Sequence, residues 1–227
     1  AVVAPAGDGS WDAAPEDLVD SFGRVVRDLR ISITDRCNFR CTYCMPEEGL
    51  QWLPKSEVLT FEEIERIAGL CVDRFGFEGV RLTGGEPTMR AEPPELIRRI
   101  AALGIDVAMT TNGATLARNA LKYRQAGLDR INISLDSLDR AKFERMTRRD
   151  ELERVLAGLR AARDAGFSPV KINSVVERDV NDDEIIDLAR FGRDEGVEVR
   201  FIEFMPLDAS DEWQRAKVVG QDEIVAT

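Results

Sequence analysis

The segment LRISITDRCNFRCTYC (residues 29–44) decides the fold, because a short strand-like run leads directly into three closely spaced cysteines. Further β-branched and apolar runs follow, alternating with segments of helical spacing. The predicted strands cover residues 29–34, 79–83, 105–111, 130–135, 169–176 and 197–204. The predicted helices cover residues 60–76, 93–103, 114–127, 137–147, 151–166 and 182–196. This alternation indicates a parallel α/β architecture.

Three architectures fit the alternation: a complete eight-unit barrel, a doubly wound sheet and a partial barrel. A complete barrel needs about 250 residues and eight units, whereas this chain of 227 residues shows six. A doubly wound sheet usually has a glycine-rich phosphate turn after its first strand, and here the cysteines occupy that place. We therefore expect a partial (β/α)6 barrel over residues 24–207. A flexible arm, 1–23, precedes it, and 208–227 start an incomplete C-terminal region.

Composition excludes several classes of function. A net charge of −11 argues against a general binder of nucleic acid or anionic membranes. The absence of histidine excludes Ser-His-Asp and Cys-His catalysis and histidine-ligated zinc or haem. The sequence shows neither a long apolar span nor a secretory signal. We expect a cytoplasmic protein, because its clustered thiols need reducing conditions to stay free of disulfides. It begins without Met and stops within a pattern, DEIVAT (222–227), which favours a piece of a longer chain.

Cys37, Cys41 and Cys44 have the spacing CxxxCxxC. Incidental buried cysteines are not normally clustered in this way. An odd number at tight spacing argues against disulfides. Structural zinc would need a fourth ligand, and the remaining cysteine, Cys71, lies on the apolar stripe of the predicted helix 60–76. Three thiolates on one loop instead suit an iron–sulfur cluster with one iron left open.

Six motifs along the chain carry a family resemblance. They are LRISITDRCNFRCTYCMP, VRLTGGEPTMR, TTNG, RINISLDSL, VKINSVVERDVND and RFIEFM. Together they resemble radical S-adenosylmethionine (SAM) enzymes, and among these the GTP 3′,8-cyclase family of molybdenum cofactor biosynthesis, over residues 24–227. The resemblance implies that Cys37, Cys41 and Cys44 ligate a [4Fe–4S] cluster, whose open iron binds SAM. SAM cleavage would then yield the 5′-deoxyadenosyl radical.

The resemblance also implies a set of SAM contacts. These are Tyr43, Gly84, Gly85, Glu86, Asn112, Ser134 and Met205. The residues alone leave other interpretations open: GGEP also suits an ordinary strand–helix turn, Tyr43 a packing aromatic, Asn112 a turn and an isolated Met a core residue. Asp136 follows Ser134, and we expect it to cap the next helix.

Four basic residues lie on different predicted strands although the chain is acidic. Each one alone would be an ordinary surface cation, but on the inner face of a barrel they would gather and require an anionic partner such as a triphosphate. The resemblance assigns these cations and two threonines to GTP. The predicted GTP-binding residues are Arg30, Arg81, Thr83, Thr110, Lys171 and Arg200. Many family members have a lysine at the position of Gly79, so this chain has one fewer cation there.

The implied activity is that of a lyase that converts GTP into a 3′,8-cyclised nucleotide. The family has a second, C-terminal three-cysteine [4Fe–4S] cluster that contacts guanine, and no cysteine follows Cys71 here, so we expect this chain to hold the radical-generating half. A separate partner protein would complete pyranopterin formation. The electron donor and the oligomeric state, a homodimer included, stay open. The alternatives are another radical SAM enzyme, such as a peptide-modifying one, and a non-catalytic three-cysteine metal-binding scaffold.

Overall fold

The computed structural model describes residues 16–206 and 213–227, which contain a six-stranded parallel sheet with strands in sequence order. The strands are β1 (Asp28–Ser32), β2 (Gly79–Thr83), β3 (Asp106–Thr111), β4 (Arg130–Ser134), β5 (Lys171–Val176) and β6 (Glu198–Glu203). Each strand pairs with the next, and β1 and β6 form the two edges. The sheet curves without closing, which confirms the prediction of a partial (β/α)6 barrel.

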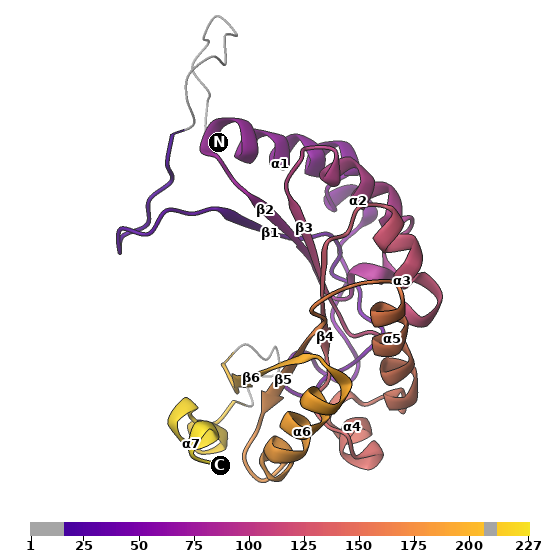
Figure 1. Ribbon diagram of the computed structural model, residues 1–227, viewed down its shortest axis with the longest axis vertical. Helices are drawn as coiled ribbons and strands as arrows, with labels where there is room; N and C mark the ends of the chain where they lie inside the picture. The colour runs from indigo at the N-terminus through magenta and orange to yellow at the C-terminus, as the bar shows by residue number, and fades with distance from the viewer. Residues whose placement is uncertain (1–15, 207–212) are drawn as a thin grey trace, which may run out of the picture.

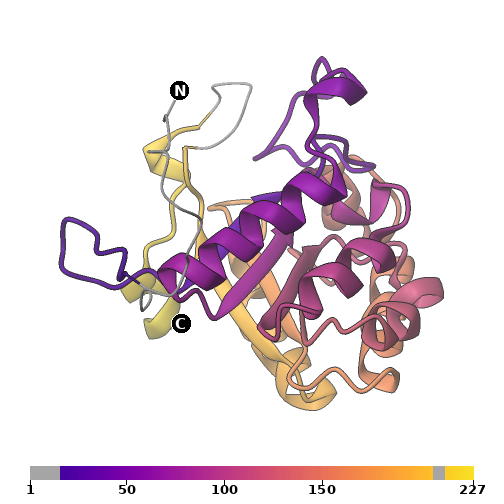
Figure 2. The ribbon, with the colours of Figure 1, turned by 90° about the horizontal axis from the view of Figure 1, so that it is seen from above.

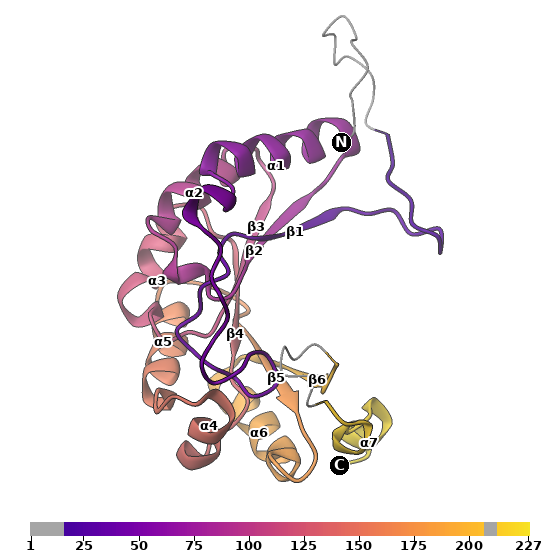
Figure 3. The same cartoon turned by 180° about the vertical axis from the view of Figure 1, so that it is seen from behind.

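Helices cover one face of this sheet. They are α1 (Phe61–Phe75), α2 (Pro93–Ala101), α3 (Leu116–Gln125), α4 (Arg140–Thr147), α5 (Leu152–Asp164) and α6 (Ile185–Glu195). A further helix, α7 (Gln221–Ala226), lies beyond β6 and apart from this layer. Short 3-10 turns occur at η1 (Lys55–Glu57), η2 (Pro87–Met89), η3 (Asp182–Glu184) and η4 (Arg215–Lys217). Figures 1 and 3 show α1 to α6 along the convex side of the curved sheet, and none of these six helices on the concave side. Figure 2 shows α1 along the flank of the sheet from above.

The core lies between the sheet and these helices because strand side chains alternate between two faces. In β2, Val80 and Leu82 are buried, whereas Arg81 between them is only half-buried. Parallel register places Leu82 beside Ile31 and Met109, so one apolar layer continues across the sheet. Burial of each such side chain stabilises the fold by about 1.5–3 kcal/mol. The same alternation leaves the polar strand residues for the concave face.

The ends of α1 follow signals that are visible in the sequence. The Thr60 hydroxyl accepts the Glu63 amide at 3.2 Å, and the Glu63 carboxylate accepts the Thr60 amide at 2.8 Å. This capping box satisfies amides that an isolated helix start leaves free. Gly76 ends the helix in the left-handed conformation, with φ of 62°. Both predicted ends are thereby confirmed.

The segments outside the strands and helices bear on the predicted boundaries. Val19 and Val25 form an antiparallel bridge, and the Glu16 amide donates to the Arg74 carbonyl at 2.8 Å. The first fifteen residues of the predicted arm and the predicted boundary at 207/208 lie outside the described residues. The division into arm, barrel and C-terminal region therefore stays a prediction. Within the described ranges, no helix combines the length and apolar character needed to cross a bilayer.

Candidate functional site

The cysteine loop, residues 37–44, follows β1 at the end of the sheet where the strands finish. The thiols of Cys37, Cys41 and Cys44 are free, and all three side chains line one cavity of about 260 Å³. Cys71 lies on α1 and does not line this cavity. The structure thus brings together the three cysteines that the spacing singled out and leaves out the fourth.

Burial raises the pKa of each of the three thiols above its ordinary value, most strongly for Cys41. Mutual repulsion adds to this effect for Cys37 and Cys41, because a second thiolate nearby disfavours the first. Three thiolates in such a cavity therefore require a positively charged group to stabilise them. In the described part of the chain, no three His, Cys, Asp or Glu side chains are placed to hold a single metal ion. Three cysteine ligands are one short of a structural zinc site, whereas they suit an iron–sulfur cluster with one open iron.

The turn Gly84-Gly85 after β2 packs directly on the segment that leads into the cysteine loop. The Gly85 amide donates to the Thr34 carbonyl at 2.7 Å, and the Glu86 amide donates to the Arg36 carbonyl at 2.8 Å. A Cβ atom on Gly85 would lie 2.4 Å from the Asp35 carbonyl oxygen. Only glycine allows this close approach. Both glycines line the smaller cavity and also fix the entry to the cysteine loop.

Glu86 is 1% exposed, and its carboxylate accepts hydrogen bonds from other residues of the chain. It accepts the Thr111 hydroxyl and the Asn112 amide, both at 2.7 Å, and the Thr88 amide at 3.1 Å. Burial raises its pKa, while these hydrogen bonds work in the opposite direction. Glu86 therefore holds the end of β3, where Asn112 reaches across to the cysteine loop and donates from Nδ2 to Asn38 Oδ1 at 2.8 Å.

Tyr43 and Asp136 join the cysteine loop to the end of β4. The Tyr43 hydroxyl donates to Asp136 Oδ2 at 2.7 Å, and Asp136 Oδ1 accepts the Val175 amide at 2.9 Å. Burial raises the pKa of Asp136 to about 6. The expectation that Asp136 caps the next helix is wrong. Asp139 caps α4 instead, accepting the Lys142 amide at 2.8 Å, because Asp136 is already engaged with partners remote in sequence.

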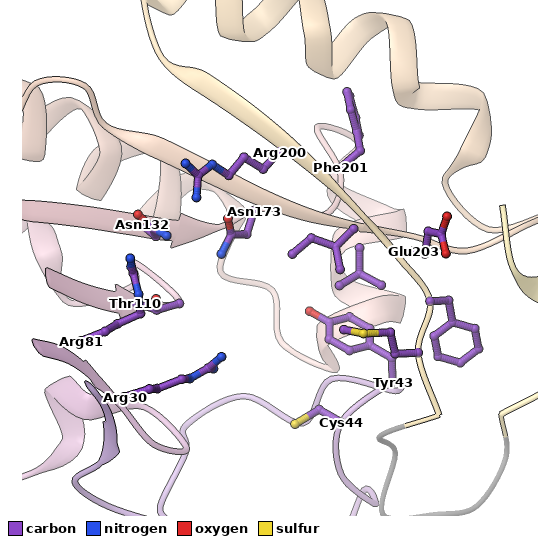
Figure 4. Close-up of a pocket in the computed structure, with 14 residues that line it drawn as sticks. Arg30, Tyr43, Cys44, Arg81, Thr110, Asn132, Asn173, Arg200, Phe201 and Glu203 are labelled. Carbon is purple, nitrogen blue, oxygen red and sulfur yellow. The ribbon is translucent and has the colours of Figure 1, made fainter. Parts of the chain in front are cut away.

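A second cavity, of about 630 Å³, lies on the concave face and shares Arg30, Tyr43, Cys44 and Thr110 with the first. Parallel register places Arg30 beside Arg81. Register likewise places Thr110 beside Asn132, and Asn173 beside Arg200. Figure 4 shows Arg30, Arg81 and Arg200 extending from different strands into this space, with Tyr43 and Cys44 at its other end. The two cavities therefore adjoin along the cysteine loop.

Positive charge dominates the inner wall of this larger cavity. Burial lowers the pKa of Arg81, and the neighbouring Arg130, Arg200 and Arg30 lower it further, because like charges disfavour one another. Arg81 Nη1 is buried and has no hydrogen-bond partner among the described residues. Such an orphaned guanidinium nitrogen is costly unless an anionic ligand supplies the missing acceptor.

Acidic side chains neutralise other cations on the concave face. The Glu198 carboxylate lies 3.0 Å from Lys171 Nζ and 2.7 Å from Arg200 Nε. Arg130, which the sequence analysis did not select, donates from Nε to both carboxylate oxygens of Asp106, at 2.7 and 2.8 Å. Among the described residues of this face, Arg81 is the cation with a buried donor that lacks a partner, and it lies beside Arg30.

The remaining candidate residues are distributed between the two cavities. Ser134 and Thr83 line the smaller cavity, and the Thr83 hydroxyl donates to the Ile31 carbonyl at 3.2 Å. Met205 lines the larger cavity and is 48% exposed. Lys171 lines neither cavity, although it stands in register with Asn132.

The sequence analysis missed Asn132 and Asn173, which line the larger cavity. The alternation of strand side chains could have found both. Asn132 lies two residues before Ser134, and Asn173 two residues after Lys171, so each shares a face with a selected residue.

Comparison with known proteins agrees with the family resemblance of the sequence motifs. The family described as the radical SAM superfamily matches residues 31–192. A GTP 3′,8-cyclase of Mycobacterium sp. (strain KMS) is 49% identical over 211 residues, covering 92% of this chain and 60% of that protein. A GTP 3′,8-cyclase of Streptomyces coelicolor is 50% identical over 212 residues, covering 92% and 62%. The chain thus spans about 60% of the length of these curated relatives.

Solved structures share the fold at low sequence identity. Methylornithine synthase matches with a TM-score of 0.69 and 18% identity, over 88% of this chain and 60% of that one. Streptococcus suis SuiB bound to S-adenosylmethionine matches with a TM-score of 0.65 and 17% identity, over 83% and 41%. These similarities support the partial barrel and carry no assignment of substrate.

Proposed function

The chain belongs to the radical SAM superfamily, and from that premise we propose that it is the radical-generating part of a GTP 3′,8-cyclase. Enzymes of this superfamily use a [4Fe–4S] cluster together with SAM. The three free thiols that line one cavity, those of Cys37 and Cys41 partly buried, fit a cationic iron–sulfur group. Cys37, Cys41 and Cys44 would hold the cluster. With SAM bound, it supplies a 5′-deoxyadenosyl radical that can abstract a substrate hydrogen.

The proposed SAM site is the wall of the smaller cavity opposite the cysteines. Gly84 and Gly85 offer backbone groups, and Ser134 and Asn112 offer polar side chains. Glu86 acts in this proposal by holding Asn112 in place, since its oxygens already accept three hydrogen bonds. Tyr43 lines both cavities and Met205 lines the larger one, and both would help to exclude water from SAM.

The proposed GTP site is the larger cavity, and one observation carries it. A half-buried Arg81 with an unfilled donor stands beside Arg30 and Arg200, in a space that adjoins the thiol cavity. A triphosphate supplies the negative charge and acceptors that these guanidinium groups lack. Thr110 adds a hydroxyl between the two cavities, and Lys171 would join if phosphate drew it away from Glu198.

Three properties of the full-length protein are part of the same proposal. These are the cyclisation of GTP for molybdenum cofactor biosynthesis, a second cluster that contacts guanine, and a partner protein that completes pyranopterin formation. A cytoplasmic location suits thiols that must stay reduced to bind iron. The names of the relatives, at about half identity over most of this chain, support GTP as substrate over a peptide.

The first experiment is anaerobic iron–sulfur reconstitution, followed by EPR of the reduced chain with and without SAM. We expect a [4Fe–4S] signal that changes when SAM is added and is lost in Cys41→Ala. A single tightly bound zinc ion and no cluster would instead favour the metal-binding scaffold.

Nucleotide binding tests the substrate separately from the cluster. Arg81→Met should weaken GTP binding about tenfold or more, since a charge-assisted hydrogen bond contributes about 1.5–3 kcal/mol. Arg140→Met, which changes an exposed arginine paired with Asp150, is the control. Equal GTP binding by both variants would remove the basis for this site and reopen the peptide-modifying alternative.

A further inference from the structure

The cysteine loop contains no helix or strand between residues 37 and 44, so its shape depends on contacts with the rest of the chain. We propose that Arg40, Arg148 and Arg149, the arginine clamp, are positioning residues that hold this loop in the form that retains the cluster. The proposal rests on membership of the superfamily and not on GTP. It can therefore be tested without any nucleotide.

Two members of the clamp come from the end of α4, more than a hundred residues along the chain. Arg148 Nη1 donates to the carbonyls of Arg40 and Met45, both at 3.2 Å. Arg149 Nε donates to the Asn38 carbonyl at 3.0 Å. Guanidinium groups thus bind carbonyls between Cys37 and Cys41 and directly after Cys44. A planar group with several donors suits this task better than an ammonium group does.

The third member, Arg40, lies inside the loop and folds back on it. Arg40 Nη1 donates to the carbonyls of Cys37 and Phe39, at 2.7 and 2.8 Å. Its guanidinium carbon lies 5.4 Å from the centre of the Trp52 ring. A Cβ atom on Gly49 would approach the same guanidinium to 3.1 Å, so the group is enclosed on that side as well.

Backbone and ring contacts connect the same two segments. The Arg40 amide donates to the Thr147 carbonyl at 3.0 Å, and the Thr42 amide to the Met146 carbonyl at 2.8 Å. The Phe39 and Phe143 rings meet edge to face, with centres 6.0 Å apart. Arg148 itself has φ of 53°, a conformation that non-glycine residues adopt at a cost. The surrounding contacts hold the residue in the conformation from which it reaches the loop.

Two measurable effects follow. Groups that orient metal ligands from outside typically change metal affinity 10–100-fold when they are mutated, so loss of the clamp should speed cluster release. The clamp also places three guanidinium groups on carbonyls of the cysteine loop, so it adds positive charge around that loop. Nearby positive charge favours the reduced cluster, which carries one more electron, so removing it should make the reduction potential more negative.

The experiment uses the 227-residue chain, reconstituted anaerobically, with Arg148→Met/Arg149→Met and Arg148→Lys/Arg149→Lys as paired variants. Arg140→Met is the matched control, because Arg140 also belongs to α4 but pairs with Asp150, with Nε 2.7 Å from Oδ1. Iron and sulfide per chain, the rate of cluster loss to excess chelator, and the reduction potential are measured without nucleotide.

We expect the methionine pair to lose its cluster about tenfold faster than Arg140→Met. The lysine pair should also lose the cluster faster, but keep a potential closer to that of the unmodified chain, because it keeps the charge. Cluster loss by the methionine pair at the rate of Arg140→Met would overturn the clamp. If circular dichroism shows that the methionine pair does not fold, cluster loss is measured on Arg149→Lys instead. Faster loss than in Arg140→Met would support the clamp, and an equal rate would overturn it. Failure of GTP binding would leave this result unaffected.

Discussion

Arg81 is a cation that the apo protein stabilises poorly. Its neighbours include three other arginines, and one of its nitrogens has no acceptor among the described residues. A partly buried charge in this position costs desolvation and repulsion energy that a bound anion would offset. The ligand-free fold should therefore tolerate its removal better than the binding site does.

We predict that Arg81→Met raises the free energy of unfolding of the ligand-free chain by roughly 1 kcal/mol, because an apolar side chain of similar length removes the repulsion. Urea denaturation measures the change. Arg140→Met, at an exposed pair, should stay within about 0.5 kcal/mol of the unmodified chain. A clear loss of stability in Arg81→Met would show that the guanidinium supports the fold itself.

Two glycines with contrasting surroundings give a second prediction at this scale. Gly85→Ala should destabilise the chain by about 2 kcal/mol or more, because the added Cβ meets the backbone carbonyls of Asp35 and Arg36 at 2.4 and 2.5 Å. Gly69→Ala in α1 meets nothing closer than Leu103 Cδ2 at 3.9 Å, and should stabilise by about 0.5–1 kcal/mol. Thermal unfolding compares the two variants. Equal shifts would contradict the close approach at Gly85.

Asp136 shows that the position of a residue beside a predicted helix does not by itself identify its hydrogen-bond partners. An aspartate just before a predicted helix is a sound cap candidate, and the true cap, Asp139, lies three residues further on. The partner that decides the matter is Tyr43, 93 residues away. Local spacing found the three cysteines of the smaller cavity, but not the side-chain pairs that join remote loops.

At the scale of elements, the sequence predicts most of what the structure shows. All six strands and the helices from α1 to α6 fall within or next to the predicted ranges, because β-branched runs and helical spacing alternate clearly. The contacts between elements were not predictable in the same way. The hydrogen bonds from Arg148 and Arg149 to the cysteine loop span 103 to 111 residues and leave no periodic pattern in the sequence.

The start of α1 gives a prediction for a single element. Thr60→Ala removes the side chain that accepts the Glu63 amide, and should lower the free energy of unfolding by about 1 kcal/mol. Glu63→Gln keeps a carbonyl oxygen for the Thr60 amide, so it should cost less. Urea denaturation of both variants separates the two parts of the cap. A larger loss in Glu63→Gln would mean that the carboxylate charge, and not the cap, stabilises this helix start.

The whole molecule carries a net negative charge, whereas the candidate site is lined by positive charges. The chain carries a net −11, yet the concave face collects Arg30 and Arg81 on one pair of neighbouring strands, and Lys171 and Arg200 on another. At about 0.1 M salt, interactions between exposed charges fade beyond roughly 10 Å. The local cations should therefore control anion binding, and the distant acidic surface should matter little.

Glu198 offers a direct test of whether local cations control anion binding. Its carboxylate contacts both Lys171 and Arg200 and would compete with phosphate for them. We predict that Glu198→Gln raises the affinity for inorganic tripolyphosphate several-fold, since the repulsion between its carboxylate and the bound anion is removed. Glu195→Gln makes the same change in net charge at the end of α6, where Glu195 pairs with Arg163. It should leave the affinity unchanged. Isothermal titration calorimetry at 0.1 M salt compares the two. Equal gains in both variants would show that net charge, and not the cluster of cations on the concave face, governs binding of the anion.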